Sequence, residues 1–329
     1  MVKKIMNRPE QIVEEMMEGF TWANQEIASF PELRVAALKE KFPGKVGVMS
    51  VGGSGHEPAH AGYIGKGMLD AAVLGNLFAS PSPEQMLKAM EEVNTGNGVL
   101  VVLKNYSGDL MNYSVAREFA EAKGISVESV VVKDDVAVPD STYSTGRRGI
   151  AGTIFVHKIA GAAAAAGASL EEVKAMAQKA AGRIRSMGMS FGACVLPGLD
   201  KPGFQIQEDQ IEVGMGIHGE PGIRTMPMKT AEELAEILVQ RILLDRSYQG
   251  EETAVLINGL GATPLMELYV LAFEVKKVLH REGISVGKVL VGNYMTSLEM
   301  AGCSVTLFGL DEELKSLLLA PCQTPAFCM

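Results

Sequence analysis

Two histidines that stand among glycines are the residues best suited to chemistry in this sequence. His56 follows the glycine-rich segment 52–55, directly after an apolar stretch, and His218 lies between Gly216 and Gly219. Glycine lets the backbone approach a bound molecule closely, and an imidazole gains or loses a proton near neutral pH. Two loops of this kind, one in each half of the chain, predict a single site shared between two lobes.

A third polar segment, 104–109, follows the apolar stretch 98–103. Such a continuous apolar stretch is typical of a buried parallel strand, and ligands of open α/β sheets bind beyond the carboxyl ends of these strands. Lys104 and Asp109 are therefore candidates for the same site. Aspartate is also a preferred helix N-cap residue, and spacing alone favours this capping role for Asp109 over a chemical one.

Residues 56–60, His-Glu-Pro-Ala-His, match the zinc-protease pattern H-E-x-x-H. That pattern places two histidines one helical turn apart, but Pro58 does not fit the interior of a helix. We therefore expect His56 in a loop and His60 in the first turns of a helix, where it caps the helix or packs in the core. No third ligand follows at a useful spacing, so the sequence predicts no metal site.

The sequence carries no recognisable nucleotide-binding motif. The pattern G-x-x-x-x-G-K-[ST] is absent, and Gly53-Ser-Gly55 is followed by Pro58 rather than by the last glycine of G-x-G-x-x-G. We therefore expect no cofactor held by this chain itself. Several charged residues near the candidate loops are interpreted as solvated or structural: Glu57, Lys66, Arg147, Arg148 and Glu220.

The composition narrows the classes of protein that the sequence fits. The 329 residues are 47% hydrophobic and 21% charged, as is ordinary for a globular protein, and carry a formal net charge of −9. This negative charge argues against nucleic acid and anionic membranes as partners. We find no secretory leader, no apolar segment long enough to span a bilayer and no CxxC among four cysteines. These features predict a cytoplasmic protein with reduced thiols.

Segments typical of strands alternate with segments typical of helices in both halves of the chain, which predicts an α/β fold. The expected strands include 46–50, 98–103, 126–132, 210–217, 253–258, 288–291 and 304–308. The expected helices include 8–23, 82–93, 110–122, 152–166, 169–187, 230–244 and 264–282. The length favours two α/β domains, which we place at 1–188 and 189–329, with the active site at strand-end loops between them.

Several long motifs occupy residues 52–72, 104–109, 149–161, 216–222, 258–264 and 292–302. These motifs resemble those of the dihydroxyacetone-binding K subunit of phosphotransferase-system-dependent dihydroxyacetone kinases. The similarity extends over nearly the whole chain. It departs from the family pattern at Val51, where glycine is frequent, and at Asn76, where glutamate is common.

The resemblance implies a role for each candidate residue. His218, in the C-terminal domain, is implied to add through an imidazole nitrogen to the substrate ketone and form a covalent hemiaminal. His56 and Asp109 are implied to be an acid/base and hydroxyl-binding pair, and either of them is a candidate for the general base. The remaining implied substrate contacts, in the N-terminal substrate-binding domain, are Gly53, Ser54, Gly55 and Lys104.

The resemblance also implies partners. In the split enzymes of this family, ADP or ATP and magnesium bind to a separate L subunit, and a phosphotransferase-system protein restores the nucleotide from phosphoenolpyruvate. The missing nucleotide motif agrees with that arrangement, and the family further implies a homodimer. Some operons of the family contain a non-catalytic paralogue that senses the triose as a coactivator, which is the alternative function that we expect.

Overall fold

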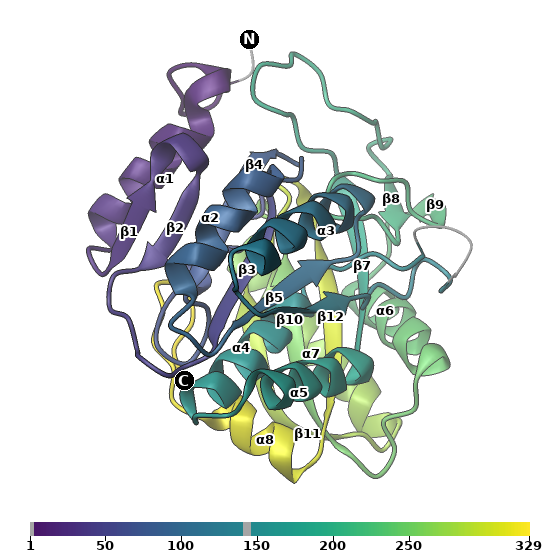
Figure 1. Cartoon of the computed structure of the whole chain (residues 1–329). Helices are drawn as coiled ribbons and strands as arrows, with labels where there is room; N and C mark the ends of the chain where they lie inside the picture. The colour runs from purple at the N-terminus through teal and green to yellow at the C-terminus, as the bar shows by residue number, and fades with distance from the viewer. Residues whose placement is uncertain (1–2, 141–145) are drawn as a thin grey trace.

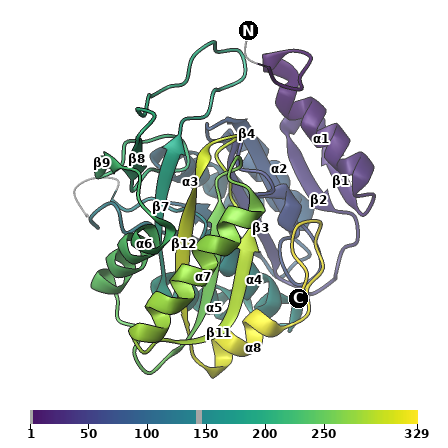
Figure 2. The same ribbon diagram turned by 180° about the vertical axis from the view of Figure 1, so that it is seen from behind.

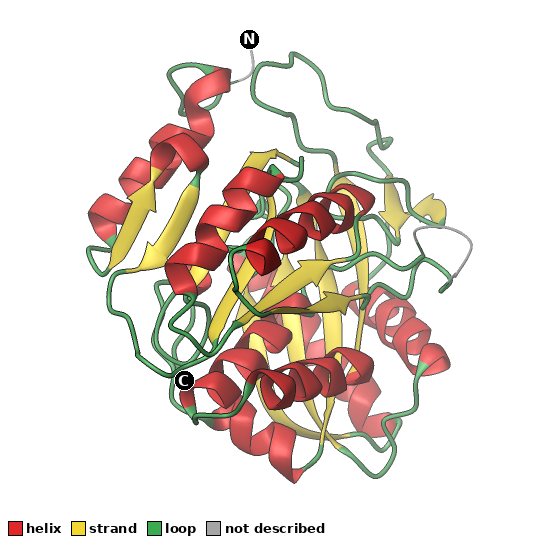
Figure 3. Ribbon diagram, in the orientation of Figure 1, coloured by secondary structure: helices red, strands yellow, loops and turns green. Residues whose placement is uncertain are grey.

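The computed structural model of the chain, which describes residues 3–140 and 146–329, is built on two six-stranded sheets (Figure 1). Helices lie on both sides of the strands (Figure 3). Because strands and helices alternate in both halves of the sequence, the predicted α/β fold is confirmed. Within the described ranges, none of the helices has both the length and the hydropathy that crossing a membrane requires.

The first sheet has the strand order β1-β2-β4-β3-β5-β6. The pairs β4–β3, β3–β5 and β5–β6 are parallel, so the carboxyl ends of β3 and β5 lie at the same edge of the sheet. The pairs β1–β2 and β2–β4 are antiparallel. The strands are β1 Ile27–Phe30, β2 Val35–Leu38, β3 Gly47–Ser54, β4 Ala71–Leu77, β5 Val99–Lys104 and β6 Val127–Val132.

The second sheet has the order β11-β10-β12-β7-β8-β9. Only the pair β10–β11 is parallel among the pairs recorded in this sheet, and the others are antiparallel. The strands are β7 Ile184–Gly192, β8 Gln210–Val213, β9 Arg224–Pro227, β10 Glu252–Gly259, β11 Ser285–Gly292 and β12 Ala301–Leu310.

Helices form layers outside and between the two sheets. The helices α2 Pro83–Val93 and α3 Ser107–Ala122 cover the outer face of the first sheet. The helices α6 Ala231–Asp245 and α7 Leu265–Arg281 cover the outer face of the second sheet (Figure 2). The inner faces share one core with α4 Thr153–Ala165 and α5 Leu170–Arg183.

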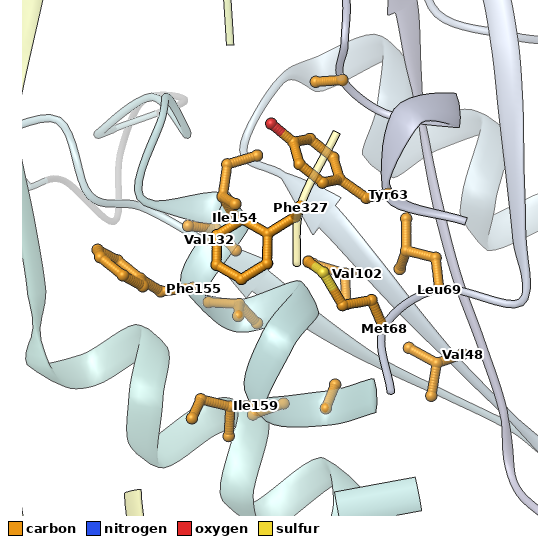
Figure 4. Packing of buried hydrophobic residues seen from close by; sticks show 14 of the residues in the cluster. Val48, Tyr63, Met68, Leu69, Val102, Val132, Ile154, Phe155, Ile159 and Phe327 are labelled. Atoms are coloured by element: carbon orange, nitrogen blue, oxygen red, sulfur yellow. The ribbon is translucent and has the colours of Figure 1, made fainter. Parts of the chain in front are cut away.

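The helix α4 is buried along nearly its whole length because it contacts both sheets. Residues 153–164 are all buried, including the polar residues Thr153, His157 and Lys158. Most of the helix is apolar, as expected for a helix that is surrounded by the core. Phe155 on α4 packs against Phe308 of β12 with ring centroids 5.2 Å apart. Ile154, Phe155 and Ile159 of α4 belong to the same buried cluster as Val102 of β5 (Figure 4). This shared core fixes the position of one sheet relative to the other.

The remaining helices are α1 Ile12–Ala23, α8 Glu312–Leu319 and the 3-10 helices η1 Pro9–Gln11, η2 Pro31–Leu33 and η3 Ala61–Tyr63. After α8, the C-terminal segment returns to the first half of the chain. There Ala326 N donates to Gly62 O, and Gln323 N donates to Lys66 O.

The domain boundary expected at residue 188 stays a prediction. It falls within β7, whose first residue is Ile184.

Several expected element boundaries are wrong, including that of the strand expected over 210–217, which ends at Val213. The helix expected over 169–187 ends at Arg183, because the following residues pair with β12. The strand expected over 46–50 continues through the glycines to Ser54, because Gly52 and Ser54 pair with β4. Glycine occurs there because a Cβ at Gly53 would lie 2.7 Å from the backbone nitrogen of Ala79. His56 therefore follows a strand that is longer than the sequence pattern indicated.

Candidate active site

His218 lies in the loop that follows β8, and Glu220 fixes its imidazole. The carboxylate of Glu220 accepts hydrogen bonds from Nδ1 of His218, at 2.9 Å, and from its backbone nitrogen, also at 2.9 Å. A carboxylate only accepts, so the proton of the neutral imidazole is on Nδ1 and the lone pair is on Nε2. Burial opposes ionisation of Glu220, but the hydrogen bonds that it accepts from His218 lower the pKa of this carboxyl to about 2.

Buried glycine and arginine residues hold this loop in place. Arg148 pairs with Asp135 at 2.7 Å and donates to the carbonyl of Gly214 at 2.7 Å. Burial raises the pKa of Asp135 to about 6, although Arg148 opposes that shift. A Cβ at Gly216 would overlap the carboxylate of Glu220 and the guanidinium of Arg148, so these groups approach the backbone only because position 216 is glycine. Arg148 is therefore structural, as the sequence indicated.

Three rings surround the imidazole of His218. The ring centroid of Tyr106 lies 4.5 Å away, that of His56 4.8 Å and that of Phe78 5.4 Å. His56 is itself stacked on Phe78, with centroids 5.2 Å apart. The side chain of His218 is 18% exposed, whereas His56 is fully buried. The reactive face of His218 is thus within reach of a small molecule and lined by these rings.

His56 is held by backbone from the second half of the chain. Its Nδ1 lies 2.8 Å from the carbonyl oxygen of Thr296, which can only accept, so Nδ1 carries the proton. Its Nε2 is buried and has no hydrogen-bond partner among residues 3–140 and 146–329. Burial lowers the pKa of His56 well below 6.5, and the charge of Lys104 lowers it further. Near neutral pH, His56 is therefore a neutral acceptor beside His218.

Tyr106 supplies a second unpaired polar group. Its hydroxyl is buried and has no hydrogen-bond partner in the part of the chain that the structure describes. Burial raises the pKa of Tyr106 well above 10, and the charge of Glu220 adds to this shift. Tyr106 thus remains a neutral phenol that can donate. A buried donor and a buried acceptor without partners, both on residues that contact His218, are typical of a site that binds a small polar ligand.

Lys104 and Asp109 lie at the end of β5 and in the first turn of α3. Both side chains are buried, with exposed fractions of 1% and 3%. Burial lowers the pKa of Lys104, and the charge of nearby Asp109 opposes that effect. The N-cap of α3 is Tyr106, so the capping role favoured for Asp109 is wrong. The carboxylate of Asp109 is therefore free of that role and lies close to the Lys104 ammonium.

The predicted substrate contacts at 53–55 form the end of β3 and the turn after it. Gly55 has φ of 100°, which favours glycine, and a Cβ there would lie 2.7 Å from the ring of Phe78. Ser54 Oγ donates to the carbonyl of Gly75 at 2.8 Å, so its hydroxyl is used within the first sheet. Leu298 N donates to Gly55 O at 2.7 Å, which joins this turn to the second half of the chain.

The two histidines of the H-E-x-x-H pattern do not converge. His60 precedes the short helix η3, makes no capping bond and is buried beside Lys104 rather than beside His56. Of the two expected roles for His60, capping is therefore wrong, and burial in the core is confirmed. Among residues 3–140 and 146–329, no group of three or more His, Cys, Asp or Glu side chains is arranged to hold a metal ion.

Comparison with known proteins places the chain in a family. The Dak1 domain matches residues 18–326. The chain belongs to the Dak1 family. It is 50% identical to the dihydroxyacetone-binding subunit DhaK of the PTS-dependent dihydroxyacetone kinase 1 of Listeria innocua, over 95% of both chains. The resemblance to dihydroxyacetone kinase K subunits is thereby confirmed.

Two solved structures share the fold of this Dak1 chain. The dihydroxyacetone kinase of C. freundii superposes with a TM-score of 0.94 at 35% identity, covering 100% of this chain and 60% of that one. The dihydroxyacetone kinase operon co-activator DhaQ superposes with a TM-score of 0.91 at 38% identity, covering 96% of this chain and 98% of that one. The same fold therefore occurs in a kinase and in a protein named as a co-activator.

The sequence did not single out every residue of the Dak1 site. The structure brings together His218 and His56 and, beside them, Lys104 with Asp109, as predicted from their strand-end positions. Glu220 was interpreted as solvated or structural, yet it bonds His218. Tyr106 and Phe78 were not considered for the site. The proximity of Glu220 to His218 in one glycine-rich loop was a usable signal, whereas no sequence pattern pointed to Phe78.

Proposed function

We propose that this chain is the dihydroxyacetone-binding subunit of a split dihydroxyacetone kinase. The observation that carries this proposal is the bond from His218 Nδ1 to Glu220, with two unpaired polar groups beside the ring, His56 Nε2 and Tyr106 Oη. The bond leaves Nε2 of the neutral imidazole as a nucleophile, and the unpaired groups suit the hydroxyls of a short ketose. The names of relatives such as the Listeria DhaK subunit support the same substrate.

The proposed binding step is covalent. Nε2 of His218 adds to the carbonyl carbon of dihydroxyacetone, so that a C–N bond forms as the π bond of the carbonyl breaks. The carbonyl oxygen becomes an alkoxide, which takes up a proton from water. The positive charge that develops on the imidazole is stabilised by the Glu220 carboxylate. Glycerol has nearly the same size but no carbonyl, so this bond selects the ketone where packing alone discriminates poorly.

The proposed transfer step uses a hydroxyl of the bound triose. His56 or Asp109 accepts the proton of a terminal hydroxyl as its oxygen attacks the terminal phosphorus of the nucleotide. ATP, formed from bound ADP, and Mg²⁺ are supplied by the partner L subunit, and the metal neutralises charge on the phosphates. This chain contributes the aligned acceptor and the base, and alignment is a large part of phosphoryl transfer.

The same proposal covers the other partners and the location. A phosphotransferase-system protein acts through the L subunit to restore the nucleotide, with phosphoenolpyruvate as the ultimate donor. Both the donor and the nucleotide are cytoplasmic, so we place the chain in the cytoplasm. The four cysteines, three buried and one exposed, are free thiols, as is usual for proteins of the reducing cytoplasm.

We further propose a homodimer, formed through α7 and the neighbouring edge strand β11. Apolar side chains cluster on the exposed face of this region, and β11 lies at the edge of the second sheet. A second copy would cover both features symmetrically. Sedimentation velocity on the full chain would contradict this proposal by showing a monomer at micromolar concentration. The exposed residues are Leu265, Met266, Tyr269, Val270, Phe273, Val286 and Val289.

A reconstituted assay tests the enzyme function. The purified chain is combined with a matching L subunit, ADP, Mg²⁺ and a phosphoryl supply from phosphoenolpyruvate, and triose phosphate is measured. We expect turnover with dihydroxyacetone and none with glycerol, and none from the chain with ATP alone. Turnover in that last mixture would mean that the chain itself binds nucleotide.

The co-activator function is the second candidate, because the fold and 38% of the aligned residues are shared with DhaQ. A triose sensor would bind dihydroxyacetone but give no triose phosphate with an active L subunit. The L subunit is shown to be active with the Listeria DhaK subunit as the positive control. Binding without turnover under those conditions would overturn the enzyme function and favour the sensor.

A further inference from the structure

A buried chain of hydrogen bonds runs from the candidate site into the core of the first sheet. Lys104 Nζ lies 2.7 Å from His60 Nε2, and His60 Nδ1 lies 3.3 Å from Ser50 Oγ. Ser50 Oγ donates to the carbonyl oxygen of Val102 at 2.9 Å, and His157 Nε2 lies 3.1 Å from the same Ser50 oxygen. Lys104, His60, Ser50 and His157 are all buried.

One set of proton positions satisfies every contact in this chain of hydrogen bonds. An ammonium group has donors only, so Nζ of Lys104 donates and Nε2 of His60 accepts. Nδ1 of His60 then carries the proton and donates to Ser50 Oγ, which uses its own proton on Val102 O. His157 Nε2 also donates to Ser50 Oγ, which has two lone pairs. The backbone carbonyl of Val102 therefore fixes the tautomer of His60 through Ser50.

His60 keeps its role as an acceptor because it stays neutral. Burial lowers the pKa of His60 well below 6.5, and the charge of Lys104 lowers it further. Burial likewise lowers the pKa of His157, to about 3, so the second imidazole also remains neutral. Among the side chains of Lys104, His60, Ser50, His157 and Asp109, the charged groups are the Lys104 ammonium and the Asp109 carboxylate.

Gly52 provides the space for this contact. A Cβ at Gly52 would lie 2.5 Å from Lys104 Nζ and 3.1 Å from His60 Nε2. The Lys104 side chain therefore passes across the glycine backbone of β3 to reach His60. Its ammonium is thus held from one side by His60 and attracted from another by Asp109.

We propose that His60 is a positioning residue, whose imidazole accepts a hydrogen bond from Lys104 and holds the ammonium beside Asp109 at the triose site. This inference rests on the proposed function, because it assigns Lys104 to substrate binding. It also explains the second histidine of the H-E-x-x-H pattern, whose partner is a lysine rather than a metal ion.

The test compares two replacements of His60 in the full chain. In His60→Leu no acceptor remains, whereas in His60→Gln the side-chain carbonyl oxygen lies near the place of Nε2 and can accept. We expect His60→Leu to weaken dihydroxyacetone binding by about 10-fold to 100-fold, since hydrogen bonds to charged groups have this effect. We expect His60→Gln to bind within about threefold of the wild type, because it restores the acceptor.

Three further measurements separate positioning from a merely structural role. His280→Leu, the same replacement on the exposed surface of α7, should leave binding unchanged. Melting temperatures are measured for each variant, because a structural role predicts that binding and stability fall together in both His60 variants. Turnover with the L subunit should show the loss in His60→Leu mainly in KM, since His60 is not the proposed base.

The outcomes distinguish this inference from the function on which it rests. A folded His60→Leu chain that binds dihydroxyacetone like the wild type would overturn the role of His60, while the proposed function would stand. A wild-type chain that binds no dihydroxyacetone would overturn the proposed function, and the inference with it. If His60→Leu does not fold, Ser50→Ala replaces it in the test, because this variant lacks the acceptor that fixes the tautomer of His60. Ser50→Ala should weaken dihydroxyacetone binding, and unchanged binding would overturn the inference.

Discussion

Replacement of His218 by alanine should abolish covalent binding of dihydroxyacetone. The wild-type chain should gain the mass of one triose by native mass spectrometry. With carbonyl-labelled [2-¹³C]dihydroxyacetone and ¹⁵N-labelled protein, a one-bond coupling between that carbon and an imidazole nitrogen should appear. His218→Ala should lose both signals and turnover. It removes an imidazole whose Nδ1 donates its proton to a carboxylate, which leaves the lone pair of Nε2 available as a nucleophile.

Two further variants sharpen this test. His280→Ala, on the exposed surface of α7, should keep the adduct in full. Glu220→Gln should form it more weakly, because the amide lacks the charge that stabilises a positive imidazole. An adduct that persists in His218→Ala would show that another group is the nucleophile. A wild-type complex with triose bound but no carbon–nitrogen coupling would show that binding is not covalent.

Replacement of the base should reduce turnover far more than it reduces binding. Asp109→Asn and His56→Asn each remove one candidate base while keeping a polar side chain of similar or smaller size. General-base catalysis commonly contributes about 10²-fold to 10⁴-fold in rate, so we expect a loss of that size in the variant that lacks the base. The other variant should show its larger defect in dihydroxyacetone affinity. Turnover is measured with a saturating L subunit, and affinity without it.

The structure gives each candidate a physical argument. His56 has an unpaired, buried Nε2 beside His218 and is kept neutral by its lowered pKa, so it can accept a proton. Asp109 is buried near the Lys104 ammonium, so its carboxylate can accept a proton or orient that ammonium. Asn112→Ala, one turn further along α3, serves as a control for local disturbance of the helix. If neither Asp109→Asn nor His56→Asn lowers turnover, the acid/base assignment is wrong.

The positions of the strands could be predicted because burial imposes a pattern on the sequence. Residues 99–104 are apolar until the final lysine, and the strand β5 does end at Lys104. The end of β3 was placed too early, because glycine weakens a strand by its own propensity and only the close approach of β4 and Ala79 explains its presence. The end of α5 was misplaced because residues 184–187 carry no helix-breaking signal.

Asp109 shows how local rules can fail within one turn. Aspartate favours N-cap positions, but the chain leaves β5 through a short turn, and Tyr106 occupies the cap without a side-chain bond. The first helical turn therefore begins three residues earlier than the sequence indicated. This shift buries the carboxylate beside Lys104 instead of bonding it to the helix backbone.

The sequence by itself determined that this is an α/β protein whose glycine-rich, histidine-bearing loops follow strands, because residue type and spacing directly reflect burial and backbone freedom. It also carried motifs long enough to identify the family. Only the tertiary structure decided which group bonds which: Thr296 with His56, Lys104 with His60, and the rings of Phe78 and Tyr106 with His218. These pairs depend on how two sheets pack across α4. Contacts between residues 44 to 240 positions apart leave no periodic pattern along the sequence.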